Sequence, residues 1–318
     1  MVELRNVGKT FGSTVAVESV SFSARPGGVF GLIGPNGAGK STTIRMIMNI
    51  LVPDTGEVRF DGRKISENDK ARIGYLPEER GLYKKVTVNE MLMYLARLKS
   101  ADPTVAQKNI DAWLEKFDLL AWKNKKIEEL SKGMSQKVQF IAAVAHDPDI
   151  LFFDEPFSGL DPVSSDLLKN TIIEIGRLGK TILISTHIMD HAERICSEIF
   201  LINKGKEVVS GPIHEVKSRY GRRSVTIEFD GDGSFMESIP EVRGLNAFPR
   251  YTELELADGA TGDDVLRRIV GRVSVKRFEL TAPSLHRIFV DLVGAKPGQI
   301  TEIRESTANA NDEVPSDE

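Results

Sequence analysis

The sequence is informative first through what it lacks. Its 318 residues contain one cysteine, Cys196, so an internal disulfide and a cysteine-based metal site are excluded, as is typical of a reducing compartment. Its apolar runs are strand-sized, well short of the roughly 18 residues that a membrane-spanning helix needs. No charged and then apolar leader follows Met1, so nothing predicts secretion. We therefore expect a cytosolic protein with no membrane span.

An excess of positive charge is also missing. The chain has 42 Lys and Arg against 46 Asp and Glu, a net charge of −4. This balance argues against binding to nucleic acid through bulk charge, and we expect no nucleic-acid partner. The length predicts about two domains, each able to bury a core of its own.

The pattern along the chain changes near residue 218. Residues 1–218 alternate short apolar runs with helix-like segments, which predicts an α/β domain. Within it, residues 87–98, 103–117 and about 135–146 predict three successive helices, a helical subdomain over about 87–146. Residues 219–300 predict a small α+β domain, and residues 301–318, with six acidic residues and one arginine, predict a disordered acidic tail.

A glycine-rich loop carries the strongest chemical signal. The stretch from Gly34 to Ser41 reads GPNGAGKS and matches the P-loop pattern, with a strand predicted at 30–33 and a helix at 42–51. Glycines let successive N–H groups face one phosphate, and the helix N-terminus adds positive potential. Lys40 is expected at the β- and γ-phosphates, and the hydroxyl of Ser41 on Mg²⁺. The candidate nucleotide-binding residues here are Gly34, Asn36, Gly37, Ala38, Gly39, Lys40, Ser41 and Thr42.

Polar side chains follow two further predicted strands. Asp154 and Glu155 come after the strand at 150–153, and His187 follows the strand that begins at 181. Because parallel strands end at the same edge of a sheet, Asp154 is a candidate Mg²⁺ ligand and Glu155 a candidate base for the attacking water. His187 is a second polar group for the γ-phosphate. Taken alone, paired acids could instead cap the next helix, and a lone histidine is more often structural.

Five further features, in order along the chain, resemble the ATP-binding cassette (ABC) ATPases. The stretch Leu130-Ser131-Lys132-Gly133-Met134 resembles their signature, Ser158-Gly159-Leu160-Asp161 their D-loop, and Ser185-Thr186-His187 their histidine switch. Phe11 falls where the family stacks an aromatic ring on adenine, and Glu78 where it has the Q-loop glutamine. The resemblance covers residues 2 to about 218 and implies a P-loop ABC cassette, with a mixed sheet core and a helical subdomain, that hydrolyses ATP with Mg²⁺.

The resemblance also implies partners. Two cassettes would dimerise head to tail, as a homodimer or a heterodimer, so that ATP on one P-loop is covered by Ser131 and Gly133 of the other, beside Asp161. Closure would drive a membrane-spanning permease subunit, which places this chain at the cytoplasmic face of the cell membrane as a peripheral protein. Lys132, Met134 and Glu78 depart from the usual pattern. The carboxylate of Glu78 could join Ser41 and Asp154 on Mg²⁺, and its negative charge would affect turnover.

Two stretches refine the resemblance. The segment from Glu78 to Tyr83 is similar to exporter ATPases of the sodium-efflux type, and Thr281 to Leu285 to the accessory domain that often ends such chains. A GTPase is set aside because neither Asn124-Lys125-Lys126 nor Asn203-Lys204-Gly205 leads to the aspartate that reads guanine. The alternative is a non-transport ABC ATPase of the translation or DNA-repair type. About 90 residues without sustained heptads separate Ser41 from Ser131, and the chain holds one cassette, so a transporter subunit is favoured.

Overall fold

The computed structural model describes residues 1–79, 81–220, 224–248, 250–257, 259–281 and 283–294. The chain divides into two compact units, Met1–Ile213 and the part from His214 onward, and each has a hydrophobic core of its own. The acidic tail expected over residues 301–318 lies outside the described residues. Within the described ranges, every helix is too short or too polar to span a bilayer.

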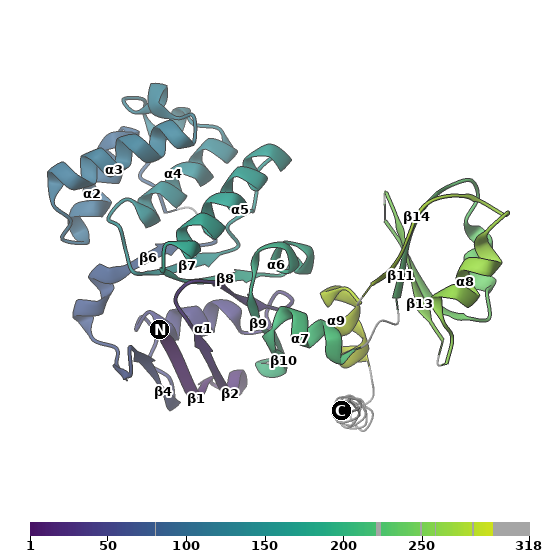
Figure 1. Ribbon diagram of the computed structural model, residues 1–318. Helices are drawn as coiled ribbons and strands as arrows, with labels where there is room; N and C mark the ends of the chain where they lie inside the picture. Colours follow the sequence, from purple (N-terminus) through teal and green to yellow (C-terminus); the bar gives the residue numbers. More distant parts are fainter. Residues whose placement is uncertain (80, 221–223, 249, 258, 282, 295–318) are drawn as a thin grey trace, which may run out of the picture. The chain divides into compact units, whose positions relative to one another are not determined.

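The centre of the first unit is a six-stranded sheet in the order β10-β9-β3-β8-β7-β6 (Figure 1). All neighbours pair in parallel except β10, which runs antiparallel to β9. β3, β7 and β8 are buried along their whole length, which explains their continuous apolar runs. The carboxyl ends of the parallel strands therefore share one edge. The bounds of these strands are Lys206–Pro212 for β10, Glu198–Asn203 for β9, Val29–Ile33 for β3, Thr181–Thr186 for β8, Ile150–Asp154 for β7 and Ile73–Leu76 for β6.

A second, antiparallel sheet in the order β2-β1-β4-β5 packs beside the first. It shares one hydrophobic core with the larger sheet and with α1, which supplies Ile44 and Ile47. The sequence predicted α1 over residues 42–51, whereas it spans Lys40–Ile47 because Gly39, at φ +108, caps its start. The bounds of its strands are Thr14–Ala24 for β2, Val2–Phe11 for β1, Thr55–Phe60 for β4 and Arg63–Lys64 for β5.

The predicted helical subdomain is present as three helices that lie side by side (Figure 1). α2 spans Val88–Leu98 and begins at the predicted capping box of Thr87 with Glu90. α3 spans Pro103–Lys116, and α4 spans Lys132–Val144, three residues earlier than predicted because Ser131 caps it. Short 3₁₀ turns elsewhere span Glu67–Arg72, Leu120–Trp122, Ile127–Glu129 and Ser234–Ser238. The remaining helices of the first unit, α5 and α6, span Pro162–Arg177 and Met189–Ile195, and α7, at the boundary with the second unit, spans Ile213–Arg219.

The second unit is built on an antiparallel sheet in the order β12-β13-β11-β14. Val225, Leu254 and Val265 join its core, to which α8 contributes one apolar face. The residue pattern predicts strands at 224–229, 252–257 and 273–280 and helices at 262–270 and 284–293, which correspond to β11, β13, β14, α8 and α9. It does not predict β12, whose residues show no apolar alternation. The bounds of its strands are Val242–Ala247 for β12, Thr252–Leu256 for β13, Ser224–Asp230 for β11 and Ser274–Thr281 for β14. Helix α8 spans Gly262–Ile269, and helix α9 spans Leu285–Gly294.

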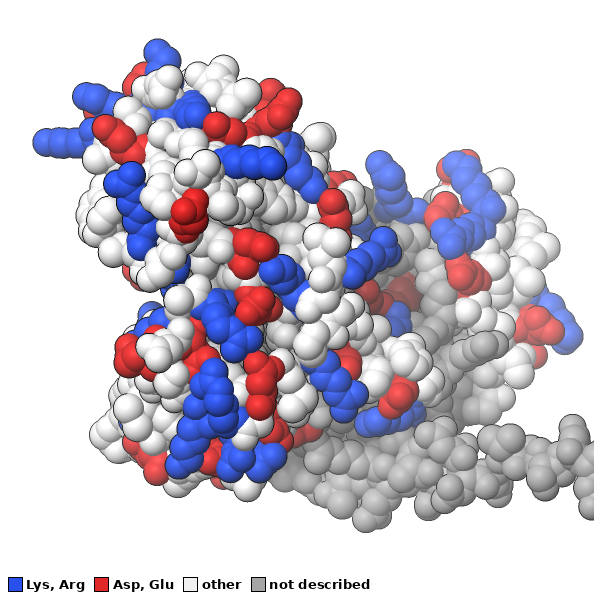
Figure 2. Space-filling view, turned by 60° about the vertical axis from the view of Figure 1, so that its left-hand side comes forward, with Lys and Arg blue, Asp and Glu red and all other residues white. Residues whose placement is uncertain are grey.

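Charged side chains of both signs are interspersed on the face that Figure 2 shows. Some ion pairs join distant segments of the chain, such as Lys116 with Glu174 at 2.6 Å and Arg72 with Asp149 at 2.8 Å. Exposed pairs of this kind contribute about 0–1 kcal/mol each. The fold of the first unit therefore depends mainly on its apolar core.

Candidate nucleotide site

The P-loop connects β3 to α1 and is shaped by close backbone contacts. Gly34 leaves no room for a side chain, because a Cβ there would lie 2.1 Å from the carbonyl oxygen of Ile202. Gly37 and Gly39 have φ of +76° and +108°, values that side chains rarely tolerate. α1 then begins with no side-chain cap and no acidic residue in its first turn. Its free N–H groups are thus available to an anion such as a phosphate.

Glu155 lies where β7 and β8 end together. Its carboxylate accepts hydrogen bonds from Oγ1 of Thr186 at 3.2 Å and from the backbone N–H of His187 at 2.9 Å. Nδ1 of His187 lies 2.7 Å from the same carboxylate. Glu155 has a positive φ of +48°, a strained backbone for a residue with a side chain, and its side chain is only 8% exposed. Asp154, the last residue of β7, is buried and accepts a hydrogen bond from the hydroxyl of Ser185.

Lys40 connects the P-loop to these carboxylates. Its ammonium donates to the carbonyl oxygens of Gly34 at 2.8 Å and Pro35 at 3.2 Å, and lies 3.9 Å from Glu155. Burial lowers the pKa of the Lys40 ammonium, while the carboxylates of Glu155, Asp154 and Glu78 act in the opposite direction. The charge of the buried Lys40 ammonium is therefore stabilised by the acidic groups on one side of it.

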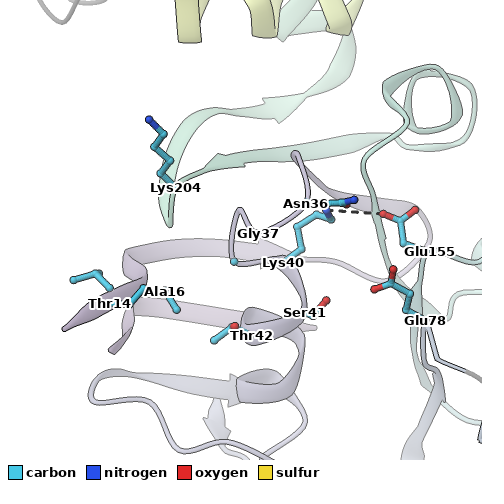
Figure 3. Close-up of a pocket in the computed structure, with 12 residues that line it drawn as sticks. Thr14, Ala16, Asn36, Gly37, Lys40, Ser41, Thr42, Glu78, Glu155 and Lys204 are labelled. Carbon is cyan, nitrogen blue, oxygen red and sulfur yellow. Dashed lines mark ion pairs between the residues drawn. The ribbon is translucent and has the colours of Figure 1, made fainter. Parts of the chain in front are cut away.

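These groups open into a pocket of about 540 Å³. Figure 3 shows Glu78 and Glu155 on one side of Lys40, and Thr14 and Ala16 on the other. A pocket of this size suits a nucleotide-sized ligand. Of the residues singled out in the sequence, the pocket wall includes Asn36, Gly37, Gly39, Lys40, Ser41, Thr42, Glu78 and Glu155.

Other predicted site residues lie behind or beside this wall. Gly34, Ala38 and Asp154 are buried next to it, and His187 contacts it through Glu155. Phe11, half exposed, ends β1 and pairs with Thr14 across the hairpin turn. Three residues belong to other places in the cassette: Ser131 caps α4, Gly133 follows it, and Asp161 caps α5, where hydrogen bonds from Ser164 lower the pKa of its carboxyl.

Sequence reasoning missed four residues of the wall: Thr14, Val15, Ala16 and Lys204. The first three begin β2, and their closeness to Phe11 in the hairpin was the signal that could have found them. Lys204 lies in the turn between β9 and β10, which reaches the P-loop because the N–H of Gly205 donates to the carbonyl oxygen of Ala38 at 2.9 Å. No sequence pattern indicated that contact.

Comparison with known proteins places both units in families. A family profile described as ABC transporter matches residues 17–158, and one described as ATP-binding protein DrrA1-3-like, C-terminal domain, matches residues 211–293. The "uncharacterized ABC transporter ATP-binding protein YhaQ" of Bacillus subtilis is 42% identical over 93% of this chain and 99% of its own length. The linearmycin resistance ATP-binding protein LnrL of Bacillus subtilis and the Nod factor export ATP-binding protein I of Burkholderia lata are each 31% identical over 92% of this chain, and over 98% and 97% of their own lengths.

Solved structures agree with this result. A structure described as an ATP binding subunit of an ABC transporter matches with a TM-score of 0.65 and 29% identity, over 70% of this chain and 93% of its own. The predicted P-loop cassette fold is thereby confirmed, and the relatives favour a transporter ATPase over the translation or DNA-repair alternative. This chain belongs to the ABC transporter ATP-binding subunits, which bind and hydrolyse ATP.

Proposed function

We propose that this chain supplies the ATP hydrolysis of an exporter, with its triphosphate held in the pocket between the P-loop and Glu155. The observation that carries the proposal is the arrangement around Lys40: one buried cation between a helix start that lacks a side-chain cap and a carboxylate aimed at the same space. Relatives that match over nine-tenths of the chain are an export subunit and a resistance subunit, and this supports export as the direction.

Hydrolysis needs a base beside the γ-phosphate, and Glu155 is the residue we assign to it. Thr186 and His187 hold its carboxylate by three contacts, so that one orientation is favoured before ATP arrives. A carboxylate so held can accept the proton of an attacking water. His187 then acts through Glu155 and at the γ-phosphate, which matches its place directly after β8.

Mg²⁺ fits the donors on this side of the pocket. Ser41, Glu78 and Asp154 offer only oxygen ligands, the type that Mg²⁺ prefers. No group of three His, Cys, Asp or Glu side chains in the described part of the chain could hold a metal by itself. We therefore propose that the metal is shared between these residues and the phosphates, where it neutralises charge.

The signature residues are proposed to act on the ATP of a second cassette. Ser131 is exposed at the N-cap of α4, and neither it nor Gly133 lines the pocket of its own chain. The first turn of α4 has no acidic residue, so its N–H groups can face a phosphate. Asp161, at the start of α5, would lie in the same interface. The dimer would hold two ATP molecules between facing P-loop and signature surfaces.

The proposal extends to the two units of the chain. Every residue that lines the pocket precedes His214, so we assign ATP chemistry to the first unit and an accessory role to the second. A chain that ends at Arg219 should then still bind ATP with Mg²⁺. If that shortened chain folds but binds no ATP, the assignment is wrong.

The membrane partner can be identified directly. We expect the full chain, extracted from its native membrane in mild detergent, to purify with a multispanning permease at the cytoplasmic face, and the complex to hydrolyse ATP. Mass spectrometry of the purified complex and an ATPase assay make the measurement. A chain that is recovered with no membrane protein, in extracts where other ABC subunits keep theirs, would contradict the transport role.

Glu78 offers a test of the metal site. Glu78→Gln should raise the Mg²⁺ concentration that gives half-maximal ATPase activity, because a neutral amide attracts the metal less than a carboxylate does. Metal-free ATP should bind equally well or better, since the repulsion between the carboxylate and the triphosphate is gone. Glu78→Ala should be slower than either. Mg²⁺ titration of the three proteins is the measurement, and identical curves would place Glu78 outside the metal site.

A further inference from the structure

The turn between β9 and β10 contains a lysine in an unfavourable conformation. Asn203 pairs with Lys206 across the hairpin, which leaves Lys204 and Gly205 as a two-residue turn with φ of +49° and +76°. Such turns favour asparagine or glycine at both positions. Glycine has no Cβ to crowd the backbone when φ is positive, and asparagine adopts a positive φ more readily than longer side chains do. A lysine at this point invites a functional explanation.

Backbone contacts fix this turn against the P-loop. The N–H of Gly205 donates to the carbonyl oxygen of Ala38 at 2.9 Å, and its own carbonyl oxygen accepts from the N–H of Glu18 at 2.8 Å. The turn is also packed closely, since a Cβ on Gly205 would lie 2.8 Å from the carbonyl oxygen of Ala16. The backbone of Lys204 is therefore held in a set position relative to the phosphate-binding loop.

The Lys204 ammonium is unused within the described residues, where it has no ion pair or hydrogen bond. Its neighbour Lys206 pairs with Glu18 at 3.1 Å, and Lys40 donates to the carbonyl oxygens of its own loop. Lys204 is exposed and lines the pocket. Figure 3 shows Lys204 on the side of Thr14, far from Glu78 and Glu155, with its ammonium turned away from the P-loop. The side chain of Lys204 thus begins at the end of the pocket that is remote from the proposed base, and rotation of its flexible stem can bring the ammonium to a ligand there.

We propose that Lys204 is a substrate-binding residue whose ammonium pairs with the α-phosphate of ATP. This inference rests on the proposed function, in which ATP occupies the pocket with its γ-phosphate near Glu155. From there the phosphates extend past Lys40 and Thr42 toward Thr14, which leaves the α-phosphate nearest to the turn. A lysine suits this role because its compact charge pairs with a single phosphate group without a fixed geometry.

The test compares Lys204→Gln with Lys206→Gln, which removes the lysine at the start of β10, directly after the turn. Equilibrium binding of ATP and ADP is measured without Mg²⁺, so that no hydrolysis occurs. Lys204→Gln should weaken both nucleotides by the same factor, about three- to tenfold, because both carry the α-phosphate. Lys206→Gln should bind both as the wild type does, and the loss in Lys204→Gln should shrink at high salt.

Lys204→Asn separates binding from structure. Asparagine suits the turn, so the melting temperature of the nucleotide-free protein should rise while the affinity for ATP falls. If Lys204 had only a structural role, the substitution would change the melting temperature and the affinity for ATP in the same direction, and that outcome would overturn the proposal. Unchanged affinity in Lys204→Gln, or a loss for ATP but not for ADP, would overturn it as well. A wild-type chain that binds no ATP would instead refute the proposed function of the pocket.

Discussion

Replacement of Glu155 by glutamine should leave ATP binding intact and lower its hydrolysis by about 10² or more, the range for loss of a general base. The amide keeps the size of the side chain and can still accept a hydrogen bond from the backbone N–H of His187, which now lies 2.9 Å away. It cannot take a proton from water. The variant should therefore bind ATP, close on a second cassette and remain closed, as an ATP-dependent dimer.

Three measurements check this result: ATP affinity, the rate of phosphate release, and the molar mass in solution with and without ATP. Glu174→Gln is a matched control, because Glu174 is an exposed glutamate that pairs with Lys116 and does not line the pocket. The control should hydrolyse ATP at the wild-type rate. If Glu155→Gln does so too, the base lies elsewhere.

Loss of the Lys40 side chain should weaken ATP binding by roughly ten- to 100-fold and abolish measurable turnover. Each hydrogen bond to a charged group contributes about 1.5–3 kcal/mol, and the contacts proposed for the ammonium with the β- and γ-phosphates are bonds of this kind. In the structure it donates to Gly34 and Pro35, so the loop loses two contacts as well. Lys40→Ala should remain folded, because Glu155 keeps its bonds to Thr186 and His187.

Lys99→Ala controls for the removal of a partly buried lysine. Like Lys40, Lys99 donates to a backbone carbonyl, that of Lys70 at 2.7 Å, and burial lowers the pKa of its ammonium. It is not part of the pocket wall. Titration calorimetry with ATP should give wild-type affinity for Lys99→Ala and a large loss for Lys40→Ala. Equal affinities in the two variants would mean that the P-loop does not hold the triphosphate.

The sequence predicted helices and strands correctly where the residues that determine the element lie within one short segment. The capping box of Thr87 with Glu90 marked the start of α2, and the buried strands β7 and β8 were read from their apolar runs. β12 was missed because Val242–Ala247 is a strand only through its pairing with β13. The start of α1 was placed two residues late, since the positive φ of Gly39 that allows the helix to begin at Lys40 is a property of the folded loop.

The sequence alone determined the glycine-rich loop, the carboxylates after β7 and the resemblance to ABC ATPases, because each is a contiguous pattern with its own chemistry. Only the tertiary structure decided which distant residues complete the pocket. Parallel pairing of β7 with β8 brings Glu155 to His187, and the bond from Gly205 to Ala38 brings Lys204 to the P-loop. Such contacts depend on the order of the strands and on hydrogen bonds between backbone groups. Because backbone groups are the same whatever side chain a residue carries, the local residue pattern does not reveal these contacts.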